Sequence, residues 1–65
     1  MKAGDLIRCK EGYFEKDVNP RGIIIEDLGV VPLGHTGLSI REFNVLFQDY
    51  VLKMYEYEMQ VINAG

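Results

Sequence analysis

The chain has 65 residues, of which 48% are hydrophobic, and its formal net charge at pH 7 is −3. A chain of this length forms one domain, here residues 1–65, and a domain so small buries only about 60% of the surface of its unfolded chain. A single cysteine, Cys9, excludes an intrachain disulfide and a multi-cysteine metal site. The acidic balance disfavours a general nucleic-acid binder. Because there is no signal-peptide core and no apolar run of membrane-spanning length, we expect a soluble, cytoplasmic protein.

The first predicted element is a short strand over residues 6–10. Ile7 and Cys9 alternate there with Arg8 and Lys10, so the first pair is expected to face the core and the second pair the solvent. A polar segment over residues 11–21 follows, interrupted by an aromatic pair at positions 13 and 14. The run Asn-Pro-Arg-Gly at residues 19–22 then predicts a turn.

A second strand is predicted over residues 22–28, where three consecutive isoleucines favour extended backbone with both faces at least partly covered. Residues 29–39 contain three glycines and Pro32, and this composition predicts a long loop. Three apolar residues of that loop are expected to pack back onto the domain, namely Val30, Val31 and Leu33.

The most informative pattern lies at residues 42–55, which fit a hairpin with Gln48 and Asp49 at its tip. Side chains alternate across a strand, so the register that sorts the two faces best is the expected one. The apolar face then pairs Phe47 with Tyr50, Val45 with Leu52, and Phe43 with Met54. The other face pairs Asn44 with Lys53, Glu42 with Tyr55, and Leu46 with Val51.

After the hairpin, residues 56–59 predict a tight helical turn and residues 60–62 a short closing strand. A helix over residues 39–64 is the alternative, because Ser39 and Glu42 match a capping box and apolar residues recur three and four positions apart. We favour strands, because the segment is rich in Val, Ile, Tyr and Phe, each of which costs roughly 0.5 kcal/mol relative to Ala in a helix.

With four or five short strands and a long central loop, the chain resembles SH3-like small barrels. It is also similar to small uncharacterised proteins of tailed phages, including those that infect marine cyanobacteria. The resemblance rests on residues 4–8, 22–26 and 45–47 as strands and on residues 58–62 as the closing turn and strand. It implies an all-β antiparallel barrel with a short helical turn before the last strand. It also implies a binding habit rather than an activity. The basic first loop of the KOW ribosomal and transcription-factor relatives is absent from this sequence.

Residues suited to catalysis are few. Cys9 is predicted to be an inert core thiol and His35 a solvated loop residue, since nothing in the sequence brings the two together. The acidic residues Glu26, Asp27, Glu56 and Glu58 are predicted to be solvated edge or turn residues. Neither phosphate-binding glycine motif is present. We therefore expect no enzymatic activity, no cofactor and no metal.

Two groups of residues are candidate partner-binding surfaces. The outward pair Leu46 and Val51, with Tyr55 nearby, is either covered by the loop over residues 29–39 or forms an interface, for which a homo-oligomer is the natural use. The other group is the aromatic pair Tyr13 and Phe14, together with Arg21. These two aromatics either bind a ligand or serve the fold, one of them plugging the end of the barrel, and we favour the plug.

The sequence therefore predicts a small protein-binding or adaptor module whose first partner to consider is a second copy of itself. In a phage setting, the partner would be a host or phage protein in the host cytoplasm. The alternative is a weak nucleic-acid binder that uses Arg8, Lys10, Tyr13, Phe14, Lys16 and Arg21. Salt separates the two, because nucleic-acid binding falls steeply with added salt and an apolar interface is nearly indifferent to it.

Overall fold

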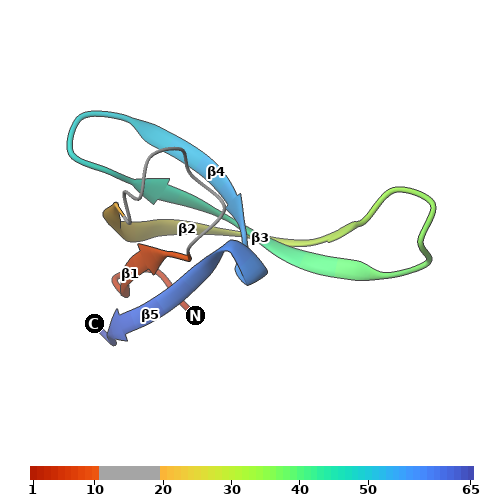
Figure 1. Cartoon of the computed structure of the whole chain (residues 1–65), viewed down its shortest axis with the longest axis horizontal. Coiled ribbons are helices and arrows are strands. Elements are labelled where there is room, and N and C mark those ends of the chain that lie inside the picture. Colours follow the sequence, from red (N-terminus) through yellow and green to blue (C-terminus); the bar gives the residue numbers. More distant parts are fainter. Residues whose placement is uncertain (11–19) are drawn as a thin grey trace.

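The computed structural model describes residues 1–10 and 20–65 and contains one antiparallel sheet of five strands (Figure 1). In space the strands follow the order β4-β3-β2-β1-β5, so β5 returns to pair with β1 at the far side of the sheet. The bounds are β1 Leu6–Cys9, β2 Arg21–Pro32, β3 Ser39–Leu46, β4 Val51–Tyr55, the 3-10 turn η1 Glu56–Glu58, and β5 Met59–Asn63.

The all-β class, the antiparallel pairing and the short helical turn before the last strand are confirmed. The sheet does not close into the predicted barrel, however. Among the described residues, β4 and β5 form its two edges and do not pair with each other. The three residues of η1 carry the chain from β4 at one edge to β5 beside β1 at the other.

The β3–β4 hairpin has the register that its alternating pattern predicts. The residues opposite one another are Glu42 and Tyr55, Phe43 and Met54, Asn44 and Lys53, Val45 and Leu52, and Leu46 and Val51. At the tip, the backbone N–H of Phe47 donates to the carbonyl of Tyr50 over 2.8 Å, and the two rings stack. The alternative helix over residues 39–64 is therefore wrong, because cross-strand pairing satisfies the backbone of this β-branched and aromatic segment.

One face of the sheet, the core face, encloses the hydrophobic core. Every strand contributes to it, and the buried apolar residues are Ile7, Cys9, Ile24, Phe43, Val45, Phe47, Met54 and Met59. The predicted cover over both faces of β2 is wrong. Ile24 is buried, whereas Ile23 and Ile25 point to the opposite, outer face and remain 45% and 46% exposed. An antiparallel sheet commonly packs one face on the core and leaves the other to solvent.

Gly22 lies inside β2, as the predicted strand over residues 22–28 requires, while the first residue of the predicted turn, Asn19, falls outside the described residues. A Cβ at position 22 would lie 2.7 Å from Cγ1 of Val45 and 2.9 Å from the carbonyl oxygen of Leu46. Only glycine allows β2 and β3 to approach this closely over the core.

Beyond the body of the sheet, β2 and β3 continue together as a two-stranded arm (Figure 1). The predicted loop over residues 29–39 is therefore wrong in extent. Residues 30–32 pair with residues 39–41, and only residues 33–38 form the turn. Gly29 and Pro32 misled the prediction, because glycine is tolerated at a bulge and proline in an edge strand, whereas Gly34 and Gly37 do lie in the turn.

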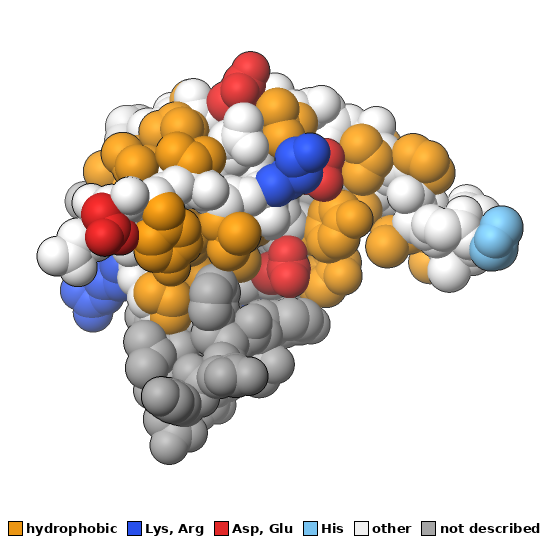
Figure 2. Space-filling view, turned by 90° about the horizontal axis from the view of Figure 1, so that it is seen from above, with side chains coloured by type: hydrophobic (Ala, Val, Ile, Leu, Met, Phe, Trp, Pro, Cys, Tyr) orange, Lys and Arg blue, Asp and Glu red, His pale blue; other side chains and the backbone are white. Residues whose placement is uncertain are grey.

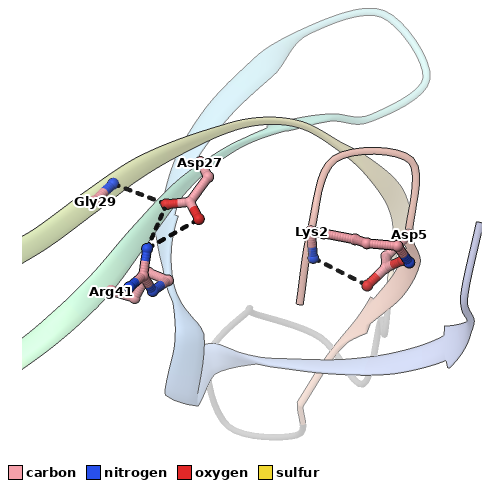
Figure 3. Close-up of polar contacts among 5 residues, drawn as sticks. All are labelled: Lys2, Asp5, Asp27, Gly29 and Arg41. Atoms are coloured by element: carbon pink, nitrogen blue, oxygen red, sulfur yellow. Dashed lines mark hydrogen bonds and ion pairs between the residues drawn. The ribbon is translucent and has the colours of Figure 1, made fainter.

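The base of the arm is held by one carboxylate. The pairing of β2 with β3 shifts between Asp27 and Gly29, where Gly29 has a φ of 88°. Asp27 accepts a 2.8 Å hydrogen bond from the backbone N–H of Gly29 and is paired with Arg41 at 2.9 Å (Figure 3). The hydrogen bond from Gly29 and, after it, the Arg41 guanidinium lower the pKa of Asp27. This bulge re-aims the strand and sets the direction of the arm.

Candidate functional site

Four apolar side chains lie opposite one another across four strands of the outer face. Leu6 pairs with Ile23, Ile23 with Leu46, and Leu46 with Val51. We call these four residues the outer apolar row. They point away from the core because side chains alternate along a strand and their neighbours Ile7, Ile24 and Val45 are buried.

Most of this row is open to solvent. The exposed fractions are 45% for Ile23, 41% for Leu46 and 52% for Val51. Exposed hydrophobic side chains gather over the body of the sheet and along the arm (Figure 2). Single exposed apolar residues are ordinary on protein surfaces, but directly opposed ones on successive strands form a continuous patch.

Residues 29–39 do not cover this patch. Val31 pairs with Ile40, at the opposite end of β3 from Leu46, and the arm leads away from the body of the sheet (Figure 1). Since Val30 is itself 58% exposed, it does not pack back onto the domain. Of the two alternatives that the sequence left open for Leu46 and Val51, cover by this segment is thereby removed.

Charged residues border the row on both sides. On β2, Arg21 stands two positions before Ile23, and Glu26 follows it past the bulge. On the β4 side, Lys53 stands two positions after Val51, and Asp49 lies two positions before it, in the turn at the hairpin tip. All four side chains are exposed. Between them on β3 lies Asn44, which is opposite both Glu26 and Lys53 and donates from Nδ2 to Glu26 over 2.9 Å.

A basic pair lies beside the β1 end of the row. Arg8 and Arg21 are direct cross-strand partners, and Arg8 donates from Nη2 to Oε1 of Gln60 over 3.0 Å. Like charges directly opposite each other destabilise a sheet. No ion pair joins either arginine to a carboxylate within the part of the chain that the structure describes.

The structure brings together half of the residues predicted to bind a partner. Leu46, Val51 and Arg21 share the outer face in neighbouring rows. Tyr55 lies on the same face but beyond Lys53, and its ring stacks on Tyr57 at a centroid distance of 5.7 Å. Tyr13 and Phe14 lie outside the described residues, so their predicted roles remain predictions.

Sequence reasoning missed Leu6 and Ile23 as members of the row. The alternation of β1 and of residues 22–25 already turns both outward, which was a usable signal. The sequence does not reveal that they stand opposite Leu46, because the register between β1, β2 and β3 is set by long-range pairing.

Asp5 was also missed. Its side chain is only 5% exposed and accepts hydrogen bonds from both the backbone N–H and Nζ of Lys2, at 3.0 and 2.8 Å (Figure 3). A third comes from the backbone N–H of Gly65 at 3.1 Å. The Lys2 side chain, foremost among these partners, lowers the pKa of Asp5. The carboxylate thereby joins residues from both ends of the chain.

Cys9 and His35 are not brought together. Cys9 has no exposed surface, its thiol donates to the sulfur of Met54 over 3.9 Å, and burial raises its pKa to about 11. His35 is exposed in the turn at the tip of the arm. Among the described residues, no group of three or more His, Cys, Asp or Glu side chains is placed to hold a metal ion.

These features define a small all-β protein. Its described residues form a single antiparallel sheet, with the core on one face and an exposed apolar row on the other. The chain matches no family model, no curated protein and no solved structure. No helix in residues 1–10 or 20–65 has the length and apolar character needed to cross a membrane.

Proposed function

We propose that this protein is a non-enzymatic protein-binding module that docks partners on the outer face of its sheet. The observation that carries the proposal is the outer apolar row, whose members Ile23, Leu46 and Val51 stand opposite one another and remain exposed. Contiguous apolar patches rimmed by polar residues are typical of interaction sites.

The energetics favour an apolar contact at this place. Burial of apolar surface stabilises a complex by roughly 25 cal/mol per Å², and β-branched side chains such as Ile23 and Val51 lose little conformational freedom when they are covered. The small core of a 65-residue domain leaves little stability in reserve, so a partner that covers this face also stabilises the fold.

The test compares Leu46→Glu with the wild type. Leu46 is exposed at the centre of the row, so the substitution leaves the core intact, and circular dichroism should show an unchanged fold. We expect the wild type to associate, either with itself in a light-scattering dilution series or with proteins of a cell extract passed over immobilised protein. Leu46→Glu should lose that association, while His35→Ala, a change at the tip of the arm, should retain it. Equal association of Leu46→Glu and wild type would contradict the proposal, as would a wild type that associates in neither experiment.

A second candidate, weak binding of single-stranded nucleic acid, is favoured by the opposed pair Arg8 and Arg21. Phosphate groups would relieve the repulsion between like charges carried by two directly opposed residues. Fluorescence anisotropy of a labelled oligonucleotide tests this function. Affinity should fall steeply with added salt and should be lost in Arg8→Ala/Arg21→Ala. Binding unaffected by salt or by the double substitution would remove this candidate.

A further inference from the structure

We infer that the partner of the outer apolar row is a second copy of this chain, docked face to face about a two-fold axis that runs along the row. This inference rests on the proposed function and names the occupant of the same face. It is carried by the distribution of charge on the two sides of the row, which is opposite in sign on β2 and on the β4 side.

On β2, the positive Arg21 lies on one side of Ile23 and the negative Glu26 on the other. On the β4 side the order is reversed, with the negative Asp49 before Val51 and the positive Lys53 after it. On β3, between these two strands, Gln48 and Asn44 flank Leu46 and are both neutral. The charges of β2 and of the β4 side are thus opposite in sign across the row, while Arg8 on β1, beside Arg21, has no charged counterpart on the other side of Leu6.

A two-fold axis along the row keeps each strand over the same strand of the second copy and exchanges the two sides of the row. Arg21 then faces Glu26 of the second copy, and Lys53 faces Asp49 of the second copy. The symmetry repeats both pairs, as an isologous interface requires. Along the axis, Ile23, Leu46 and Val51 meet their own counterparts, as in the packing of two sheets.

An axis that runs along β3 would also match charges. It would place Arg21 over Asp49 of the second copy, and Glu26 over Lys53. It would leave Leu6 outside the contact, however, because β1 would then lie beyond β4 of the second copy. The axis along the row brings all four members of the row into the contact, and this larger apolar area favours it.

The division of roles follows from the exposure of these groups. The apolar side chains supply the area removed from water, whereas the charged residues stay at the rim, where ion pairs add little affinity but fix the register of association. The local bonds of Glu26 are compatible with this role, since it accepts one hydrogen bond from Asn44 and stays exposed.

Charge reversal provides a sharp test. Arg21→Glu leaves positions 21 and 26 both negative, and Glu26→Arg leaves both positive, so each variant repels its own copies. A mixture of the two variants restores attraction at both contacts. In sedimentation velocity at low ionic strength, we expect each variant alone to self-associate about tenfold more weakly than the wild type or worse. The equimolar mixture should recover the wild-type mass, and so should the double variant Arg21→Glu/Glu26→Arg.

The control is Glu56→Arg, a charge reversal of the same kind in η1, away from the row, which should associate like the wild type. A wild type that stays monomeric up to millimolar concentration would overturn the inference. So would charge variants that associate as strongly as the wild type and gain nothing on mixing. If Leu46→Glu abolishes binding of a second copy or of another protein, but the charge reversals at positions 21 and 26 do not weaken that binding, the proposed function stands and this arrangement fails. If Leu46→Glu has no effect, both fail.

Discussion

Asp5 shows how much one carboxylate can organise in a domain this small. Two of its hydrogen bonds come from Lys2 and one from Gly65, so it connects the segment before β1 to the residues after β5. The backbone beside it belongs to the same junction, since the N–H of Ile24 donates to the carbonyl of Asp5 over 3.0 Å. A buried carboxylate with three donors prefers its charged form.

This preference predicts an acid-sensitive contribution to stability. The folded pKa of Asp5 lies below its ordinary value of 3.8, so above that value the carboxylate is charged in both states and stabilises the fold. As the pH falls below 3.8, the unfolded chain takes up the proton first and the contribution is lost. Asp5→Asn should therefore lower the free energy of unfolding at neutral pH, and the difference from wild type should narrow in acid. Urea unfolding at several pH values measures this, and a difference that is constant or widens in acid would contradict it.

At the scale of one element, β3 shows most clearly how alternation divides side chains between the core face and the outer face. Phe43 and Val45 face the core with no exposed surface, while Asn44 and Leu46 face outward. The same strand therefore supplies the centre of the core and the centre of the outer apolar row. A shift of one residue would exchange these two faces, so the register of β3 fixes both stability and the candidate site.

Aspartate substitutions at two adjacent positions of β3 test the assignment of residues to the core face and the outer face. Val45→Asp buries an unpaired carboxylate and should cost more than about 4 kcal/mol of unfolding free energy. A domain of 65 residues has roughly 3–10 kcal/mol in total, so this loss removes a large part of its stability or all of it. Asn44→Asp, which lies opposite Lys53, should cost about 1 kcal/mol through the lost hydrogen bond to Glu26. Thermal unfolding followed by circular dichroism compares the two, and similar losses would refute the assignment of faces.

At the scale of the whole molecule, the arm makes the domain more extended, while the core is small. The radius of gyration is 11.8 Å, against the roughly 11 Å expected for a compact domain of this length. The excess agrees with the arm, which extends past the other strands (Figure 1). The core that remains is small and centres on side chains from all five strands, with Cys9 in contact with Met54.

Because Cys9 lies in this shared core, its thiol should report on global unfolding. Its pKa of about 11, raised by burial and then by Glu58, keeps the thiol neutral where an unfolded chain, with an ordinary value of 9.0, begins to ionise. Stability should therefore decrease as the pH rises from 9.0 towards 11. At pH 8, a thiol-reactive disulfide reagent should label the native protein at least a hundredfold more slowly than the urea-unfolded chain. Comparable rates in the two states would show that Cys9 is accessible without unfolding.

Much of the local structure could be predicted from particular residues. Ile7 and Cys9 alternate with charged residues and lie on the core face of β1. The sorted faces of residues 42–55 predicted the register of the β3–β4 hairpin correctly. The prediction failed at residues 29–39, where glycine and proline indicated a loop and long-range pairing made an arm. It also failed for Ile23 and Ile25, because three consecutive isoleucines do not reveal which of them has a covering layer.

What the sequence determined by itself was therefore local: which residues alternate, where the β3–β4 hairpin turns, and that Leu46 and Val51 form an outward apolar pair. Such features depend on strand geometry and on neighbours a few residues away. Only the tertiary structure decided that β5 pairs with β1, that Ile23 and Leu6 extend the pair into a row, and that no segment of the arm covers it. These outcomes depend on pairing between distant segments, and the physical choice among such pairings is made by how all five strands share one small core.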